Sequence, residues 1–371
     1  MQPLDGVFVL DFTTLLPGPM ATLLLAEAGA EVVKVERPDR GDEMRGYEPK
    51  WGGNSINFAM LNRGKKSISL DLKKSEDRAK LQPLVERADV IVEQFRPGTM
   101  ARLGLDYESV TRVNPRVVYC AITGYGQTGP KRNAAGHDLN YIGDAGLLSL
   151  SMGSAAHPVL PPALIADIAG GAYPAVMNIL FALMNRRNSG AGCYLDISMT
   201  DNLFPFMYWA VGNVKALGMP PGNGSDLVTG GSPRYHLYET KDNKIVAAAP
   251  LEQKFWEAFC EIILLEPQFR DDAQDATMTM RRVAEIISAD TAEVWRRRFS
   301  DRDCCCSIVA SVQEALDDPQ FKARKLFDWE VANENGQRMS ALPVPVMPPF
   351  RMPAGSAVSP QLGEQNGKYL L

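Results

Sequence analysis

The chain has 371 residues, of which 45% are hydrophobic, and its formal net charge is −5. A chain of this length and apolar content is expected to form about two domains with a sizeable core, which excludes a disordered or fibrous protein. The acidic balance disfavours general binding to nucleic acid or to an anionic membrane, so we expect neither as a partner and favour work on a small molecule.

Six cysteines are present, and three of them, Cys304, Cys305 and Cys306, are contiguous. Adjacent thiols do not readily cross-link one another, and no C-x-x-C pair accompanies them. We therefore expect reduced cysteines, no metal site and a cytoplasmic location. The first residues lack the basic start and apolar run of a secretory signal, so export is not expected either. The sequence leaves the role of the three adjacent cysteines open.

A strand, a helix and a second strand are predicted at the start of the chain, over Gly6–Phe12, Pro19–Ala28 and Glu31–Glu36. This order is typical of a right-handed unit in a doubly wound parallel sheet, so a Rossmann-like α/β domain is expected. The connecting turn, residues 13–19, lacks the G-x-G-x-x-G pattern that brings backbone against a pyrophosphate. The fold therefore does not imply NAD.

A basic cluster precedes the next predicted strand, Ile68–Leu72. Asn62, Arg63, Lys65 and Lys66 lie there, and basic side chains beside a strand end suit the phosphates of a ligand such as coenzyme A. A solvated turn explains the spacing equally well.

Two further strands are predicted over Ala88–Glu93 and Val117–Ile122. The first continues into Arg96, and the second continues into a glycine-rich loop that contains Gly124 and Tyr125. Open α/β sheets bind ligands beyond the carboxyl ends of their strands, so these residues are candidates for a binding site.

Two groups able to move protons near neutral pH, His137 and Asp167, stand at predicted helix starts. Apolar residues follow both, at Leu139, Ile142, Leu147 and Leu148 and at Ile168, Val176, Ile179 and Leu180. This pattern predicts helices that bury one side and leave their first turns open to a ligand. Taken alone, such residues are more often a surface contact and a helix cap.

The longest apolar run is Ile168–Met184, which Gly170, Gly171, Pro174 and Asn178 interrupt. It is shorter than the roughly 20 residues that a membrane helix needs. We therefore expect a buried core helix there.

The second half of the chain predicts a smaller α+β domain. A hairpin is expected over Tyr235–Glu239 and Lys244–Ala249. Three helices are expected after it: one that begins at Glu252, one over residues 276–288 and one over 291–300. The predicted organisation is a large domain over 1–198, a linker over 199–231, a small domain over 232–330 and a C-terminal segment, 331–371, that returns to the large domain. Its proline-rich part, Leu342–Ser359, cannot be a helix and is expected to be an extended strap.

Several motifs in this order resemble one family. They are Leu15–Pro19, Val33–Pro38, Asn62–Ser67, Phe95–Gly98, Gly124–Pro130 and Asp167–Gly171. The chain is identified as a member of the class III CoA-transferase (CaiB/BaiF) family, which includes the α-methylacyl-CoA racemases. The resemblance covers essentially the whole chain. It implies a Rossmann-like large domain, a small domain, an interlocked homodimer and an acyl-CoA substrate without a separate cofactor.

Within this family the form Gly136-His137-Asp138-Leu139-Asn140-Tyr141 is similar to the racemases. The resemblance implies that His137 and Asp167 are the two acid/base groups of a 1,1-proton transfer through an enolate, supported by Glu252. An ordinary first-turn carboxylate remains the alternative for Glu252. The segment from Gly41 to Phe58 resembles the transferases instead, so transfer of CoA between carboxylates, with Asp167 as nucleophile, is the second hypothesis.

The substrate and CoA site implied by the motifs and the resemblance contains ten residues: Arg37, Asn62, Arg63, Lys65, Lys66, Arg96, Gly124, Tyr125, Asp138 and Tyr141. The acyl group itself is not specified. Methionines and aromatic residues near Met199 and Met207 are candidates for contacts with it, and a dimer core explains them equally well.

Overall fold

The computed structural model describes residues 2–353 and 355–370 and divides the chain into two compact units. The first unit comprises Met1–Ala145, Ala163–Pro205 and Lys322–Leu371. The second comprises Gly146–Pro162 and Phe206–Phe321. Each unit is described by itself.

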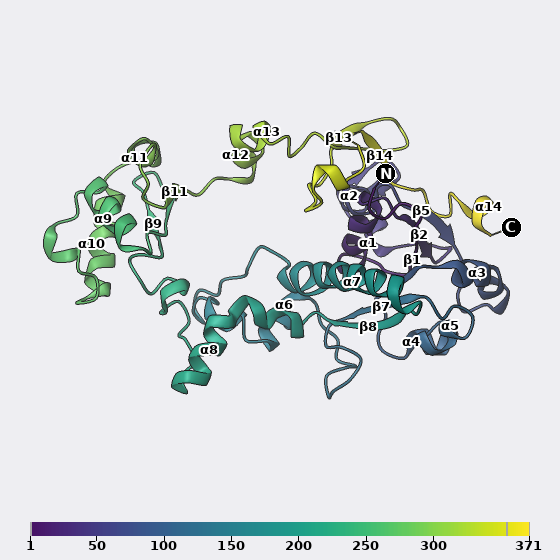
Figure 1. Ribbon diagram of the computed structural model, residues 1–371. Coiled ribbons are helices and arrows are strands. Elements are labelled where there is room, and N and C mark those ends of the chain that lie inside the picture. Colours follow the sequence, from purple (N-terminus) through teal and green to yellow (C-terminus); the bar gives the residue numbers. More distant parts are fainter. Residues whose placement is uncertain (1, 354, 371) are drawn as a thin grey trace. The chain divides into compact units, whose positions relative to one another are not determined.

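The first unit contains a six-stranded parallel sheet in the order β5-β2-β1-β6-β7-β8 (Figure 1). The strands are β1 Phe8–Asp11, β2 Glu31–Glu36, β5 Lys66–Ser69, β6 Val90–Glu93, β7 Val118–Thr123 and β8 Cys193–Ser198. Strand order reverses between β1 and β6, and doubly wound sheets bind ligands at such a switch point. The predicted Rossmann-like parallel sheet is confirmed.

Helices cover both faces of this sheet because the inner strands are apolar on both sides. Leu10, Val33 and Ile91 pack on one face with Leu81 and Leu84 of α3. On the other face α1 packs against α7, and all residues of α1 are buried. The helices of this unit are α1 Pro17–Glu27, α2 Ile56–Asn62, α3 Ser75–Arg87, α4 Thr99–Leu103, α5 Tyr107–Thr111, α6 Asp138–Asp144, α7 Tyr173–Ser189 and α14 Asn366–Tyr369.

A π-helical segment, Ala166–Ala172, runs directly into α7, so one continuous helix covers Ala166–Ser189. Gly170 does not interrupt it; the missing side chain allows close contact, since a Cβ there would lie 2.4 Å from the carbonyl oxygen of Met199. By length and composition this is the one helix in the described residues that could cross a membrane. Its predicted burial holds for one face only, because Phe181 and Met184 on the other face are exposed.

A buried group of charges fixes the loop that follows β1. Lys65 Nζ lies 3.2 Å from Asp11 Oδ2, and Lys34 Nζ lies 2.9 Å from Asp42 Oδ2. Asp42 Oδ1 also accepts the N–H of Leu15 (3.0 Å), which holds Leu15 in a left-handed conformation with φ of 61°. Burial alone would raise the pKa of Asp11, but the two lysines lower it to about 2. The first loop at the switch point is therefore rigidly held.

The C-terminal segment packs on the first unit. The N–H of Met352 donates to the carbonyl of Glu27 (2.8 Å), and the N–H of Gly64 donates to the carbonyl of Val358 (3.0 Å). In this segment β12 Glu330–Ala332 pairs with β13 Arg338–Ser340 and with β14 Ser356–Val358. Among the residues of its proline-rich part that the structure describes, no α-helix forms, as predicted, although one 3-10 turn covers Pro348–Phe350.

The second unit is α+β. Its sheet has the order β11-β10-β9, with β9 His236–Glu239, β10 Ile245–Ala248 and β11 Cys306–Ile308. The predicted hairpin is thus present. Its helices are α8 Tyr208–Leu217, α9 Gln253–Ile262, α10 Ala276–Ser288, α11 Ala292–Phe299 and α12 Val312–Asp317, and α13 Pro319–Ala323 crosses the boundary. A core of Trp256, Phe259, Trp295 and their neighbours joins the helices of the second unit to its sheet.

The first unit also contains two short strands outside its main sheet. They are β3 Lys50–Trp51 and β4 Asn54–Ser55, which pair with each other.

Candidate active site

A cavity of about 560 Å³ lies in the first unit at the switch point. The loops that follow β1, β6 and β7 contribute to its wall, as the strand order predicts. Its lining includes Leu15, Pro17, Gln94, Phe95, Arg96, Thr123, Gly124, Tyr125, Arg132, His137, Asn140, Tyr141, Asp167 and Met199. Six predicted site residues therefore meet in one cavity: Arg96, Gly124, Tyr125, His137, Tyr141 and Asp167.

His137 is the residue immediately before α6, with extended backbone geometry. Its N–H donates to the side-chain oxygen of Asn140 (3.0 Å), and the N–H of Asn140 donates to the carbonyl of His137 (2.8 Å). This reciprocal contact satisfies donors that a helix start leaves free. The imidazole is thus carried by a well-defined helix start. The helix is shorter than the apolar pattern predicted, and Leu139 is exposed.

Tyr141 lines the cavity together with His137. Its hydroxyl donates to the carbonyl of Gly136 (2.5 Å), and its ring meets Tyr125 edge-on with centroids 5.3 Å apart. A Cβ at Gly124 would lie 2.4 Å from the Tyr141 ring, so only glycine fits there. The close approach of the Tyr141 ring to the backbone therefore explains the glycine at position 124 of the loop.

Asp167 is half-buried in the first turn of the long helix. Its N–H donates to Oδ1 of Asp138 (2.9 Å), a side chain that is 4% exposed. Burial and then the charge of Asp138 raise the pKa of Asp167 to about 6, against a smaller opposing effect of His137. The cavity thus holds the His137 imidazole together with a carboxyl that exchanges protons near neutral pH.

Arg96 brings positive charge to the cavity. It is exposed, and within the described ranges no carboxylate oxygen lies within 4 Å of its guanidinium. Gln94, two residues earlier, donates to the carbonyl of Thr14 (2.6 Å) and accepts the N–H of Gly18 (3.0 Å). This amide fastens the loop after β6 to the loop after β1.

Gln94, Thr123, Arg132 and Asn140 were not predicted from the sequence as site residues, although all four line the cavity. Met199, a candidate for contacts with the acyl group, lines it as well. Gln94 and Thr123 were detectable in principle, because both stand at carboxyl ends of predicted strands. Arg132 carried no such signal.

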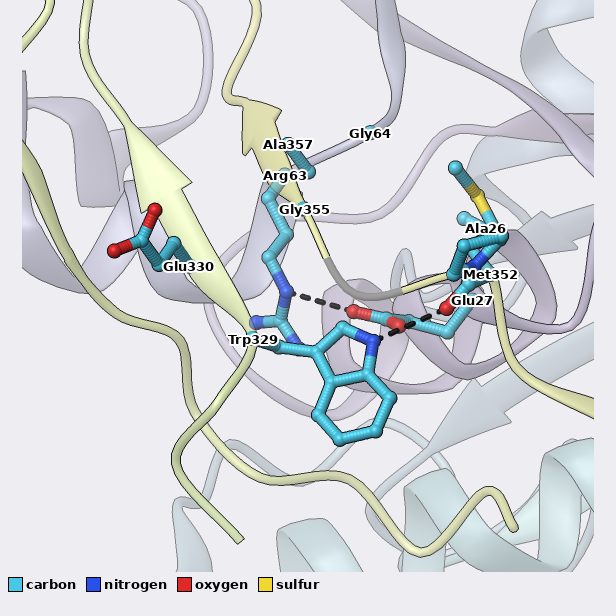
Figure 2. A pocket seen from close by; sticks show the side chains of 10 residues that line it. Ala26, Glu27, Arg63, Gly64, Trp329, Glu330, Met352, Gly355 and Ala357 are labelled. Carbon is cyan, nitrogen blue, oxygen red and sulfur yellow. Dashed lines mark hydrogen bonds and ion pairs between the residues drawn. The ribbon is translucent and has the colours of Figure 1, made fainter. Parts of the chain in front are cut away.

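The basic cluster lies elsewhere. Asn62, Arg63 and Lys65 are buried, and the cavity lining contains none of them. Arg63 pairs with Glu27 (2.7 Å) beside a small separate cavity, where Trp329 of the C-terminal segment also lies (Figure 2). Lys65 donates to Asp11, Thr22, Asn62 and the carbonyl of Pro19. These side chains use their charges internally.

Lys66 begins β5 and is half-buried, and Arg37 is exposed and paired with Glu43. Neither lines the cavity. Asp138 lies behind Asp167 rather than on the cavity wall. Glu252 is in the second unit, exposed, directly before α9. Its predicted support of His137 therefore stays a prediction. In the part of the chain that the structure describes, no group of three or more His, Cys, Asp or Glu residues is arranged to hold a metal ion.

Comparison with known proteins assigns the chain to a family. CoA-transferase family III matches residues 4–366, so the chain belongs to this family. Human alpha-methylacyl-CoA racemase is 31% identical over 354 residues, which cover 93% of this chain and 86% of the human protein. Succinate–glutarate CoA-transferase of Agrobacterium fabrum is 33% identical over 389 residues, with 99% and 95% covered.

A solved structure of a CaiB/BaiF family protein from Brucella suis has the same fold, with a TM-score of 0.82, 27% identity, and 99% of this chain and 98% of that chain covered. The resemblance predicted from the motifs is confirmed. Family membership implies an enzyme that acts on an acyl-CoA thioester. The relatives include both racemases and transferases.

Proposed function

We propose that the protein is a racemase or epimerase that inverts the α-carbon of 2-methylacyl-CoA thioesters. The observation that carries this proposal is that His137 and Asp167 line one cavity while the pKa of Asp167 is raised to about 6. Inversion needs one group to remove the α-proton and another to deliver a proton to the opposite face. A carboxyl with this pKa serves in either role near neutral pH.

The intermediate of this reaction is an enolate, whose oxygen needs hydrogen-bond donors. The backbone N–H groups at the start of α6 stand beside His137, and those of Asp138 and Leu139 have no acceptor among the described residues. We expect one of them to face the thioester oxygen. Donors of this kind stabilise the developing charge without an added metal.

Transfer of CoA between carboxylates is the second candidate. Identity of 33% with a succinate–glutarate CoA-transferase, nearly end to end, favours it, as does the transferase-like segment from Gly41 to Phe58. Here Asp167 would act as an ionised nucleophile that displaces CoA from the substrate and forms a mixed anhydride with its acyl group. The CoA thiolate would then release the acid and form a thioester with Asp167. An ionised nucleophile does not benefit from a raised pKa, so the electrostatics of the cavity favour the racemase.

Exchange of the α-proton separates the two reactions. The protein is incubated with one pure epimer of a 2-methylacyl-CoA in deuterated water, without an acceptor acid, and deuterium at the α-carbon is measured by mass spectrometry. A racemase incorporates deuterium and inverts the centre. A transferase does neither, and instead moves CoA to an acceptor acid once one is added. Transfer with no exchange would contradict the proposal.

Single substitutions sharpen this test. His137→Ala and Asp167→Asn each remove one base, so each variant should retain exchange with one epimer only, and with opposite preference, while inversion falls by about 10²-fold or more. Full activity of His137→Ala, with a covalent adduct trapped on Asp167 by hydroxylamine, would leave the transferase standing.

We also propose a cytoplasmic homodimer. An apolar groove of about 590 Å³ runs along α1, α7 and the strap, lined by Leu24, Met177, Phe181, Met347 and other apolar side chains. Exposed apolar area of this kind marks protein interfaces more often than free surface. Light scattering should give a mass twice that of the 40.7 kDa chain. A measured mass equal to that of one chain would contradict the proposed dimer. Fractionation of the source cells tests the location.

A further inference from the structure

Asp138 is a buried carboxylate with no basic partner. Its side chain is 4% exposed, and in the described residues no lysine or arginine nitrogen lies within 4 Å of its oxygens. Burying an unpaired charge is costly, so such a group is retained only where something else requires it.

The one side-chain hydrogen bond described for Asp138 explains where it acts. Its Oδ1 accepts the N–H of Asp167 (2.9 Å). The first N–H groups of a helix have no acceptor within the helix, and here a side chain from a different helix supplies one. Because Asp138 follows His137 directly in the chain, this bond ties the backbone at His137 to the backbone at Asp167.

We infer that Asp138 is a positioning residue for Asp167: its carboxylate caps the helix that carries Asp167 and holds a fixed negative charge beside that carboxyl. The inference rests on the proposed function in treating Asp167 as an acid/base group. It assigns the Asp138 side chain to the catalytic pair rather than to the substrate.

The charges around Asp167 agree with this assignment. Burial is the largest cause of its raised pKa, Asp138 adds to it, and His137 opposes both. The elements packed on this segment are α1, α6, α7 and β8. Their titratable groups are Glu27, His137, Asp138, Tyr141, Asp144, Tyr173, Arg186, Arg187, Cys193, Tyr194 and Asp196. Glu27 and Arg186 are held in ion pairs with Arg63, Arg351 and Asp89. Asp138 is thus the acidic neighbour that acts on Asp167.

The consequence for racemisation concerns the protonation state of Asp167. A carboxyl with a pKa of about 6 is present in both its protonated and its ionised form near neutral pH. An enzyme that works on both epimers needs both forms, because Asp167 removes a proton from one epimer and delivers a proton to the other. Without the Asp138 charge the carboxyl would hold its proton less well, so a smaller fraction of it would be protonated near neutral pH and able to deliver a proton.

Asp138→Asn is the direct test, because the amide oxygen still accepts the Asp167 N–H while the charge is removed. Carboxyl carbons are titrated by NMR in protein labelled with ¹³C-aspartate, and the Asp167 signal is assigned as the one missing in Asp167→Asn. The pKa of Asp167 should fall by about one unit. The acidic limb of the exchange rate should move to lower pH by the same amount.

Asp144→Asn is the matched control, since it removes a carboxylate from the other end of α6, where Asp144 contacts Tyr125 and Lys131. It should leave the Asp167 titration in place. Asp138→Ser, also neutral and able to accept, is the second variant if the asparagine variant does not fold. In Asp138→Ala, which also lacks the acceptor, exchange at the optimum should fall about tenfold further, as for loss of a hydrogen bond.

An unchanged Asp167 titration in a folded, neutral Asp138 variant would overturn the inference, even if stability dropped. Failure of the proposed function has a different signature. A wild-type protein that exchanges no α-proton refutes the racemase, whereas the NMR titration still decides the role of Asp138.

Discussion

The two groups of buried carboxylates at the sheet differ in their partners. Beneath the loop after β1, Asp11 and Asp42 face Lys65 and Lys34 within ion-pair distance. Beside the cavity, Asp138 accepts the backbone N–H of Asp167, and neither carboxyl group forms an ion pair among the described residues. The pKa of Asp11 is accordingly lowered to about 2, and that of Asp167 is raised to about 6.

This difference distinguishes carboxylates that stabilise the fold from a carboxyl group that can take part in catalysis. A carboxylate compensated by lysines stays ionised through the physiological range and can only hold structure. A carboxyl group whose pKa is raised by burial and by a nearby like charge can gain and lose a proton near neutral pH, as catalysis requires. Asp42 holds Leu15, which lines the same cavity as Asp167, so position alone does not distinguish the two groups.

The largest effect is expected from breaking the compensated group. Lys65→Met leaves Asp11 buried with one cation fewer, and loss of one partner of a buried pair typically costs about 3–5 kcal/mol. The free energy of unfolding, measured by urea denaturation, should fall by that amount. Asp11→Asn/Lys65→Met should recover part of it, because no uncompensated charge remains.

Lys66→Met is the control for this variant, one residue along and half-buried. Its stability should change by about 0.5 kcal/mol or less, as for ordinary surface sites. Equal losses in the two variants would contradict a special role for Lys65. A fall in CoA affinity without a loss of stability would return Lys65 to the ligand site.

A smaller effect of opposite sign is expected at the uncompensated group. The pKa of Asp167 is higher in the folded protein than in the unfolded chain. Folded protein therefore binds more protons between about pH 4 and pH 6, and wild-type stability is lost as pH rises through this window. Asp167→Asn removes that cost.

The variant should be more stable than wild type at pH 8 by about 2 kcal/mol, less than the full shift implies because the side chain is partly solvated. At pH 4 the two proteins should unfold alike. Thermal unfolding at both pH values measures this, and an advantage that persists at pH 4 would show that packing rather than ionisation is responsible.

The sequence predicted regular elements well where local signals bound them. β2 covers the predicted residues Glu31–Glu36, which lie between Gly29 and Pro38, and α10 covers 276–288 after the cap at Asp275. His137 and Asp167 were predicted as one site from motifs, and the structure places both on one cavity.

The basic cluster shows what local patterns miss. The next strand was predicted from Ile68 but begins at Lys66, so Lys65 enters the core instead of a surface turn. The partner that makes this burial tolerable, Asp11, is 54 positions away in sequence. A pattern of neighbouring residues carries no information about such a partner. For the same reason the contact of Asp138 with Asp167 was not predicted.

The smallest effect is expected at Arg96, which lines the cavity and, like Arg132, has no carboxylate partner among the described residues. Its guanidinium is free to meet a ligand anion, and charge-assisted hydrogen bonds to phosphate are strong. Arg96→Ala should weaken binding of the CoA ester about tenfold while the rate of α-proton exchange in the saturated enzyme changes little. Isothermal titration with the CoA ester at two salt concentrations measures this, and the wild-type advantage should shrink at high salt.

Arg338→Ala is the control for loss of one positive charge, because Arg338 of β13 has an exposed guanidinium that pairs with Glu330. This variant should bind as the wild type does. Equal affinities of Arg96→Ala and wild type would remove Arg96 from the ligand site, and a slower bound-state exchange with unchanged affinity would move its role from phosphate binding to the reacting centre.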